Sequence, residues 1–134
     1  MRVLIVDDEP IVRESMSELL PWKEMGFETV LCARDAYDAQ KELELERIDV
    51  FISDIEMPGM DGLALSKWVH ERFPRTVILL LTCHASFSYA QSAIRYGVMD
   101  YLLKPVIKTD LEQCVQKAIR LIQEENKKIE TENE

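Results

Sequence analysis

The chain has 134 residues, the size of one ordinary globular domain, and its apolar content of 47% is enough to fill a hydrophobic core. Its formal net charge of −9, from 16 basic and 25 acidic side chains, argues against a nucleic-acid-binding surface on this domain, because phosphate binding needs a basic face. The chain has three cysteines without metal-type spacing, which favours free thiols. It shows no recognisable signal peptide and no long apolar stretch, so we expect a cytoplasmic protein and not a secreted or membrane protein.

Short apolar runs alternate with helical patterns along the whole chain. Strands are expected over residues 3–6, 29–33, 50–54, 77–82 and 101–104. Helices are expected over residues 9–20, 35–46, 63–73 and 87–96, and a last helix begins near residue 109. This alternation predicts an α/β fold with a parallel sheet and right-handed crossovers, in which the less apolar second strand lies at an edge.

Four of the five apolar runs end in side chains that can do chemistry. The first run ends at Asp7 and Asp8, the third at Asp54, the fourth at Thr82 and the fifth at Lys104. Ligands of open α/β sheets collect beyond the carboxyl ends of the strands, so these five side chains are expected to converge. Three carboxylates, a hydroxyl and an ammonium form a set that suits a divalent cation together with a phosphoryl group.

Acidic residues are crowded along this edge of the predicted sheet. They are Asp7, Asp8, Glu9, Asp54 and Glu56. Two such charges ~4 Å apart repel by up to ~4 kcal/mol at an effective dielectric of ~20, and a bound cation removes that repulsion. The structural alternative is that the Asp7–Asp8 pair caps the following helix, a role that Glu9 is expected to have in any case.

Four motifs in this order resemble the receiver domain of two-component response regulators. They are VLIVDDE at residues 3–9, DIEMPGMDG at residues 54–62, Thr82, and YLLKP at residues 101–105. The resemblance covers residues 1–122 and implies a flavodoxin-like (βα)5 doubly wound sandwich, with a five-stranded parallel sheet in the order 2-1-3-4-5. Residues 20–22 with 25–27, and residues 86–90 with 100–105, further resemble receivers that precede AraC-type DNA-binding domains.

The resemblance implies a phosphoacceptor and a magnesium site. Asp54 is the implied acceptor of a phosphoryl group from a histidine kinase, and the alternative is a buried aspartate that caps the next turn. By the same resemblance, Asp8 and Asp54 bind Mg²⁺ directly, the Glu56 carbonyl adds an oxygen, and Asp7 acts through water.

The resemblance also implies a switch. Lys104 pairs with Asp54 before phosphorylation and then with the phosphoryl oxygens, and a cis bond to Pro105 aims its ammonium inward. In the implied switch, the Thr82 hydroxyl donates to the phosphoryl group and draws the following loop inward. Tyr101 then turns into the space that this loop vacates. The alternative for Tyr101 is an ordinary aromatic residue on an edge strand.

Two positions near the motifs, those of Glu56 and His84, vary within the family that this chain resembles and set its rates. The Glu56 side chain is expected to overhang the site and to affect phosphorylation rates, unless it points to solvent and only its carbonyl matters. His84, two residues after Thr82, is more simply an exposed loop residue than a catalyst, and Cys83 is expected to pack against the core.

The function expected from these residues is phosphorylation-controlled signalling in transcription regulation. The domain is expected to catalyse only its own phosphoryl transfer and slow dephosphorylation, and not to be an enzyme with turnover. A haloacid-dehalogenase-like phosphatase requires an Asp-x-Asp motif, whereas this chain has Asp7-Asp8-Glu9. A receiver-like module that never takes phosphate typically lacks one of the motif residues, and all of them are present here. The expected output is a surface change that controls homodimerisation or a tethered domain.

Residues 123–134 differ in composition from the rest of the chain. They hold five glutamates and two lysines, with Ile129 as the only large apolar residue. They are interpreted as an acidic helix end or a linker toward an output domain that is missing from this sequence. A heptad seam continues into them, made of Leu111, Val115, Ala118, Ile122, Glu125 and Ile129. It allows a coiled-coil linker, and the alternative is a helix that frays near Gln123.

Overall fold

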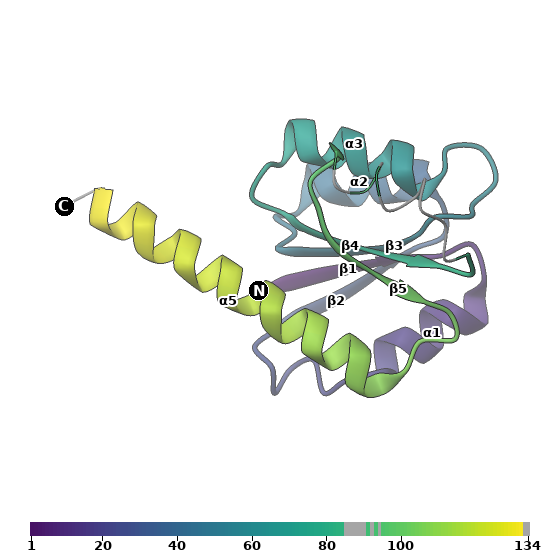
Figure 1. Ribbon diagram of the computed structural model, residues 1–134, viewed down its shortest axis with the longest axis horizontal. Helices are drawn as coiled ribbons and strands as arrows, with labels where there is room; N and C mark the ends of the chain where they lie inside the picture. The colour runs from purple at the N-terminus through teal and green to yellow at the C-terminus, as the bar shows by residue number, and fades with distance from the viewer. Residues whose placement is uncertain (85–90, 92, 94, 133–134) are drawn as a thin grey trace.

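A computed structural model of the chain describes residues 1–84, 91, 93 and 95–132. Its centre is a parallel sheet of five strands in the order β2-β1-β3-β4-β5, which confirms the predicted flavodoxin-like fold (Figure 1). The strands are β1 (Arg2–Val6), β2 (Thr29–Ala33), β3 (Val50–Asp54), β4 (Val77–Thr82) and β5 (Val98–Leu103). The three inner strands are almost fully buried, as expected for a sheet that is covered on both faces.

The helices form a layer on each face of the sheet. They are α1 (Pro10–Leu19), α2 (Ala36–Leu45), α3 (Gly62–Arg72) and α5 (Lys108–Glu132). Figure 1 shows α1 and α5 on one face and α2 and α3 on the other. The helix predicted over residues 87–96 lies largely outside the described residues, of which 91, 93 and 95 are helical. None of the helices in the described ranges is both long and apolar enough to cross a membrane.

The alternation of side chains along each strand divides the core into two clusters. In β1, Val3 and Ile5 join the cluster under α1 and α5, whereas Leu4 and Val6 join the cluster under α2 and α3. The other inner strands divide their side chains in the same way. The period of two that defines a strand therefore fills both faces from one continuous apolar run.

The first turns of the helices show how each is fixed in place. The Asp35 and Asp61 carboxylates cap α2 and α3 by accepting from backbone N–H groups at 2.8 Å each. Glu9 occupies the same position before α1, but its side chain makes no capping hydrogen bond, so that expectation is wrong. The reason is chemical, because the longer glutamate is a poor N-cap and Pro10 at the first helical position already lacks an N–H group.

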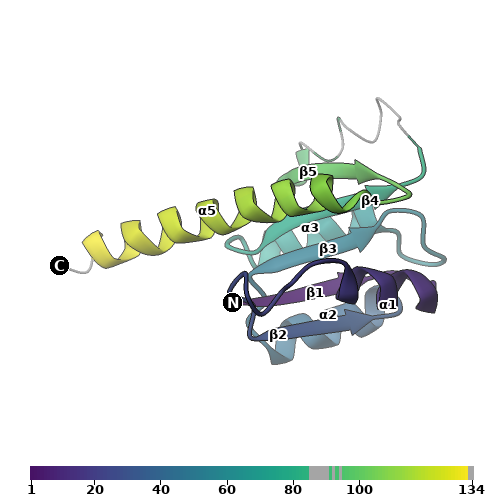
Figure 2. The same cartoon turned by 90° about the horizontal axis from the view of Figure 1, so that it is seen from below.

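Helix α5 extends beyond the body of the domain (Figure 2). It is continuous to Glu132 and does not fray near Gln123. Four residues of the proposed seam, Leu111, Val115, Ala118 and Ile122, are buried against the sheet in the cluster that α1 also covers. The first four of the six seam positions therefore belong to the domain core, which leaves Glu125 and Ile129 on the projecting part.

Candidate functional site

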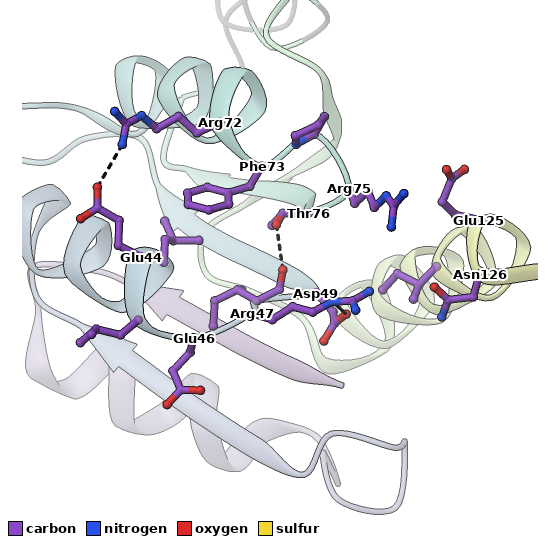
Figure 3. A pocket seen from close by; sticks show the side chains of 15 residues that line it. Glu44, Glu46, Arg47, Asp49, Arg72, Phe73, Arg75, Thr76, Glu125 and Asn126 are labelled. Atoms are coloured by element: carbon purple, nitrogen blue, oxygen red, sulfur yellow. Dashed lines mark hydrogen bonds and ion pairs between the residues drawn. The ribbon is translucent and has the colours of Figure 1, made fainter. Parts of the chain in front are cut away.

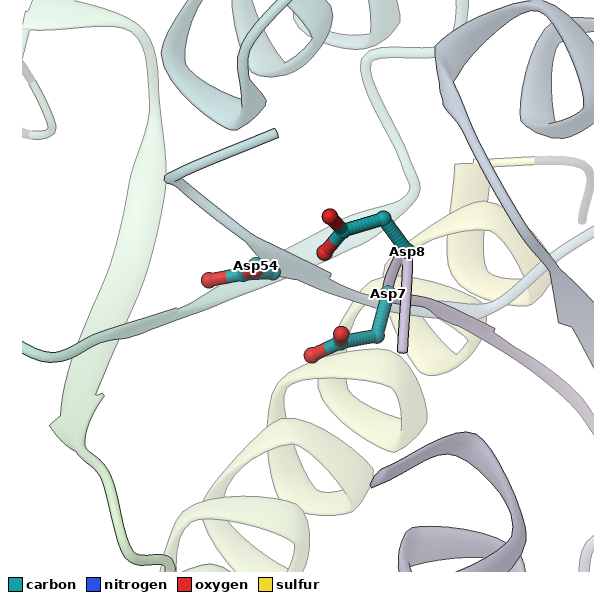
Figure 4. Close-up of side chains that lie close together, drawn as sticks. All are labelled: Asp7, Asp8 and Asp54. Carbon is teal, nitrogen blue, oxygen red and sulfur yellow. The ribbon is translucent and has the colours of Figure 1, made fainter. Parts of the chain in front are cut away.

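Three aspartates meet at the carboxyl edge of the sheet (Figure 4). Asp7 and Asp8 follow β1, and Asp54 ends β3, which pairs with β1 in parallel. One carboxylate oxygen from each lies within 4.8 Å of the other two, with Asp7 and Asp54 buried and Asp8 exposed. Oxygen ligands at this spacing, one of them open to solvent, fit a hard divalent cation that keeps part of its hydration shell.

Lys104 brings a positive charge into this cluster from the end of β5. Its ammonium donates to Asp7 Oδ2 at 2.8 Å and lies 3.3 Å from Asp54 Oδ1. The expected pairing with Asp54 is thus an ion pair without hydrogen-bond geometry, and the closer partner is Asp7. The Lys104–Pro105 peptide bond is cis. One ammonium therefore serves two buried carboxylates and cannot neutralise both.

Asp7 is held by contacts that the sequence did not indicate. Its Oδ1 accepts from the Glu9 amide at 2.9 Å, and its carbonyl accepts from Arg13 Nη1 at 2.7 Å. Arg13 lies in the second turn of α1 and anchors the loop between β1 and α1. Nothing in the sequence separates Arg13 from an ordinary surface arginine, since only the fold places its guanidinium beneath this loop.

The Glu56 side chain reaches across the sheet edge to Thr82. The buried Thr82 hydroxyl donates to the Glu56 carboxylate and accepts from the His84 amide at 3.0 Å. Among the described residues, neither Glu56 Oε2 nor Asp54 Oδ1 has a hydrogen-bond partner, although both oxygens are buried. Two such acceptors beside the acidic cluster provide lone pairs for a cation or a donor that the protein itself does not supply.

The electrostatics of the site follow from burial and unequal pairing. Burial raises the pKa of Asp54 to about 7, and the Asp7 charge adds to this rise while Lys104 opposes it. Burial alone would raise the pKa of Glu56, but hydrogen bonds, first that from Thr82, hold it below its usual value. Burial would lower the pKa of Lys104, but the hydrogen bond to Asp7 and the charges of Asp7 and Asp54 raise it.

The remaining sequence candidates lie around this cluster. Tyr101 is half-buried on β5, packs beside the α2 and α3 face, and pairs with Leu80 of β4. His84 is exposed, as expected. Cys83 is also exposed, so the expectation that it packs against the core is wrong. The last inward-facing residue of β4 is Thr82, and Cys83 already lies in the loop beyond the sheet.

A pocket of about 450 Å³ lies at the opposite edge of the sheet (Figure 3). It is lined by the turns before β3 and β4 and by α5 near Glu125. Two of its arginines are paired, Arg72 with Glu44 at 3.1 Å and Arg47 with Asp49 at 3.7 Å. It contains none of the motif residues and lies apart from the acidic cluster.

A protein-family model described as the response regulator receiver domain matches residues 3–116. This chain belongs to that family. Two curated relatives of the receiver are the uncharacterized transcriptional regulatory protein YesN of Bacillus subtilis, 35% identical over 78% of this chain, and the transcriptional regulatory protein HptR of Staphylococcus aureus, 32% identical over 92%. The chain spans 28% of the length of the first and 48% of the second.

Solved structures agree with this assignment. The receiver is 40% identical to the receiver domain of AraT, a response regulator from Geobacillus stearothermophilus, with a TM-score of 0.84 over 93% of this chain and 97% of that one. It is 30% identical to the response regulator TrrA from Thermotoga maritima, solved with Mg²⁺ and BeF, with a TM-score of 0.75 over 87% of this chain and 97% of that one.

Proposed function

We propose that this receiver accepts a phosphoryl group on Asp54 from a histidine kinase and then changes the surface that controls its output. The observation that supports this most is the position of Asp54. It ends the central strand β3, is 2% exposed, has a carboxylate oxygen within 4.8 Å of oxygens of Asp7 and Asp8, and lies 3.3 Å from the Lys104 ammonium. A carboxylate so placed is a nucleophile whose charge is partly offset by Lys104, with two further carboxylates beside it that can share a cation.

The proposed transfer requires little covalent machinery from the protein. An Asp54 oxygen bonds to phosphorus while the phosphorus–nitrogen bond of the kinase phosphohistidine breaks, and the departing imidazole keeps the electron pair and takes up a proton. Lys104 offsets charge on the phosphoryl oxygens. The domain thus acts on itself by positioning and charge neutralisation, and the acyl phosphate is later lost to water.

Asp8 and Asp54 would hold Mg²⁺ directly, the Glu56 carbonyl would add an oxygen, and Asp7 would act through water. Bound there, Mg²⁺ supplies positive charge that offsets the carboxylates and the phosphoryl oxygens. The open position of Asp8 and the unpartnered Asp54 oxygen support this assignment.

The proposed output is a switch at Thr82 and Tyr101 that acts on dimerisation and a tethered domain. Thr82 lies beside the acceptor, and Tyr101 lies on the neighbouring strand β5. The relatives are transcriptional regulators about two to three times as long as this chain, which supports a tethered output domain, and the sequence resemblance favours an AraC-type DNA-binding domain.

Intact mass after incubation with acetyl phosphate and Mg²⁺ tests the acceptor. We expect the parent to gain the mass of one phosphoryl group and Asp54→Asn to gain none. Asp61→Asn is a matched control, because it changes an exposed aspartate in the same loop and keeps a capping side chain. Equal uptake by Asp54→Asn and the parent would show that the acceptor is another residue.

The metal assignment is tested in the same assay. Asp8→Ala is expected to fold and to lose uptake, because the exposed metal ligand is gone. Without Mg²⁺ its free energy of unfolding in urea should equal or exceed that of the parent, since one repelling charge is removed. Undiminished uptake by Asp8→Ala would exclude Asp8 as a metal ligand.

A further inference from the structure

The contact between Glu56 and Thr82 links the two loops that a phosphoryl group on Asp54 would touch. Glu56 lies two residues after the acceptor, and Thr82 ends the next strand, β4. We infer that the Glu56 carboxylate is a latch that holds the Thr82 hydroxyl in the unphosphorylated arrangement and sets how easily the domain switches. This inference rests on the proposed function, because the latch matters only if Asp54 takes up a phosphoryl group.

The hydrogen-bonding capacity of Thr82 makes the latch exclusive. A hydroxyl has one proton to donate, and in this structure that proton goes to Glu56. Ionised Glu56 can only accept, so its contact with Thr82 uses the hydroxyl proton, for which the His84 carbonyl at 3.3 Å is the weaker competitor, while Oγ1 accepts from the His84 amide at 3.0 Å. Thr82 therefore cannot donate to a phosphoryl group on Asp54 until it releases Glu56.

The unpartnered oxygens show what would release the latch. Glu56 Oε2 and Asp54 Oδ1 are both buried and, within the described part of the chain, neither accepts a hydrogen bond. A phosphoryl group on Asp54 adds negative charge beside the Glu56 carboxylate, where burial keeps the dielectric low. That charge repels Glu56 and at the same time offers Thr82 a stronger acceptor. Both effects favour breaking the contact between Glu56 and Thr82. Glu56 therefore holds Thr82 only while Asp54 carries no phosphoryl group.

Beryllofluoride with Mg²⁺, a mimic of a phosphoryl group on a carboxylate, is the probe for this inference. Its dissociation constant is measured by titration for the parent, Glu56→Ala, Thr82→Ala and the double variant. Glu56→Ala is expected to bind about tenfold more tightly than the parent, the low end of what a hydrogen bond to a charged group contributes. In the Thr82→Ala background the same change should tighten binding clearly less than it does in the parent, because only charge repulsion remains and there is no latch to break.

Simple charge repulsion between Glu56 and the ligand predicts a different pattern. It would tighten binding equally in both backgrounds, and that result would overturn the latch. Unchanged or weaker binding by Glu56→Ala would also overturn it. Glu56→Gln is close in shape to the parent and keeps a hydrogen-bond acceptor without the charge. Its dissociation constant for beryllofluoride should lie between those of the parent and Glu56→Ala. If the parent itself fails to bind beryllofluoride, the proposed function is overturned, and the inference with it.

A readout without ligand separates the latch from general structural damage. The His84 amide donates to Thr82, so its NMR shift reports on the position of that hydroxyl. In the free protein, Glu56→Ala should move this shift toward its position in the beryllofluoride-bound parent. Glu24→Ala, an exposed carboxylate in the loop between α1 and β2, should leave it in place. A His84 shift that moves equally in both variants, or in neither, would contradict the latch.

Discussion

Lys104 lies 2.8 Å from Asp7 and 3.3 Å from Asp54, so its hydrogen bond goes to Asp7 and not to Asp54, the proposed acceptor. This preference leaves Asp54 Oδ1 buried and without a hydrogen-bond partner in the described ranges. Of the two buried aspartates, the proposed acceptor is thus the less satisfied one. A buried oxygen without a hydrogen-bond partner lowers the stability of the fold. The same free lone pair is what a nucleophile uses to form a bond.

The raised pKa of Asp54 predicts how stability depends on pH in the absence of Mg²⁺. Burial moves the pKa from 3.8 to about 7. Below pH 3.8 the Asp54 carboxyl is protonated in both the folded and the unfolded state. Between pH 3.8 and about 7 it is ionised in the unfolded state but still protonated in the folded state. The free energy of unfolding therefore falls as pH rises through this interval, by at most about 1.4 kcal/mol per unit, and levels off above it.

Urea unfolding of the parent and Asp54→Asn at several pH values from 4 to 8 checks this prediction. The variant lacks the titrating group. The difference in free energy of unfolding between Asp54→Asn and the parent should therefore shift in favour of the variant as pH rises from 3.8 to about 7, and then stay constant. Excess Mg²⁺ should reduce the difference above the interval, because cation binding favours the ionised carboxylate. Parallel profiles for the two proteins would show that Asp54 titrates at its ordinary pKa.

At the scale of elements, the junction between β3 and α3 sets the position of Asp54, the proposed acceptor. A Cβ added to Gly62, the first residue of α3, would overlap the Asp54 carbonyl oxygen and lie 2.8 Å from Ile55 Cα. The Gly62 amide also donates to the Ile55 carbonyl at 2.9 Å. The absence of a side chain therefore lets the helix begin directly against the strand end that carries Asp54.

Gly62→Ala is expected to destabilise the protein by roughly 1–3 kcal/mol, as overpacking typically does, and to slow phosphorylation by acetyl phosphate. Both effects arise because the overlap is with backbone, which must shift together with Asp54. Thermal unfolding and intact mass measure them. Gly59→Ala is the control, since its Cβ would meet open space and only its φ of 79° is unfavourable. Normal uptake by Gly62→Ala would show that the junction tolerates the shift.

The sequence predicts elements better than contacts, and particular residues show why. Strand periodicity and the turn at Pro58 and Gly59 are local signals, so β3 and α3 appear within one residue of their predicted limits. Strand order and the convergence of four motifs followed from the family resemblance and the rule for parallel sheets. The Arg13 and Glu56 contacts depend on side-chain reach between loops far apart in sequence, which no local pattern encodes.

At the scale of the whole molecule, the two edges of the sheet differ in character. The carboxyl edge carries the acidic cluster and Lys104, while α5 passes the other edge and projects beyond it (Figure 2). In the proposed function, a change at Thr82 would reach an output domain after α5 by way of the sheet and α5. Because α5 packs on β4 and β5, it is the element through which such a change would travel.

Removal of residues 124–134 tests whether the projecting part of α5 forms a coiled coil. The buried seam residues end at Ile122, and beyond it Glu125 occupies a core position, so only Ile129 offers an apolar contact. One apolar residue is too little for a stable seam, since a coiled coil needs apolar residues at both core positions of successive heptads. We therefore expect the truncated protein, after acetyl phosphate and Mg²⁺ treatment, to dimerise as well as the full chain in light scattering. Its free energy of unfolding should change by less than about 0.5 kcal/mol, as for exposed segments without core contacts. A truncated protein that stays monomeric where the full chain dimerises would assign the dimer contact to the projecting helix.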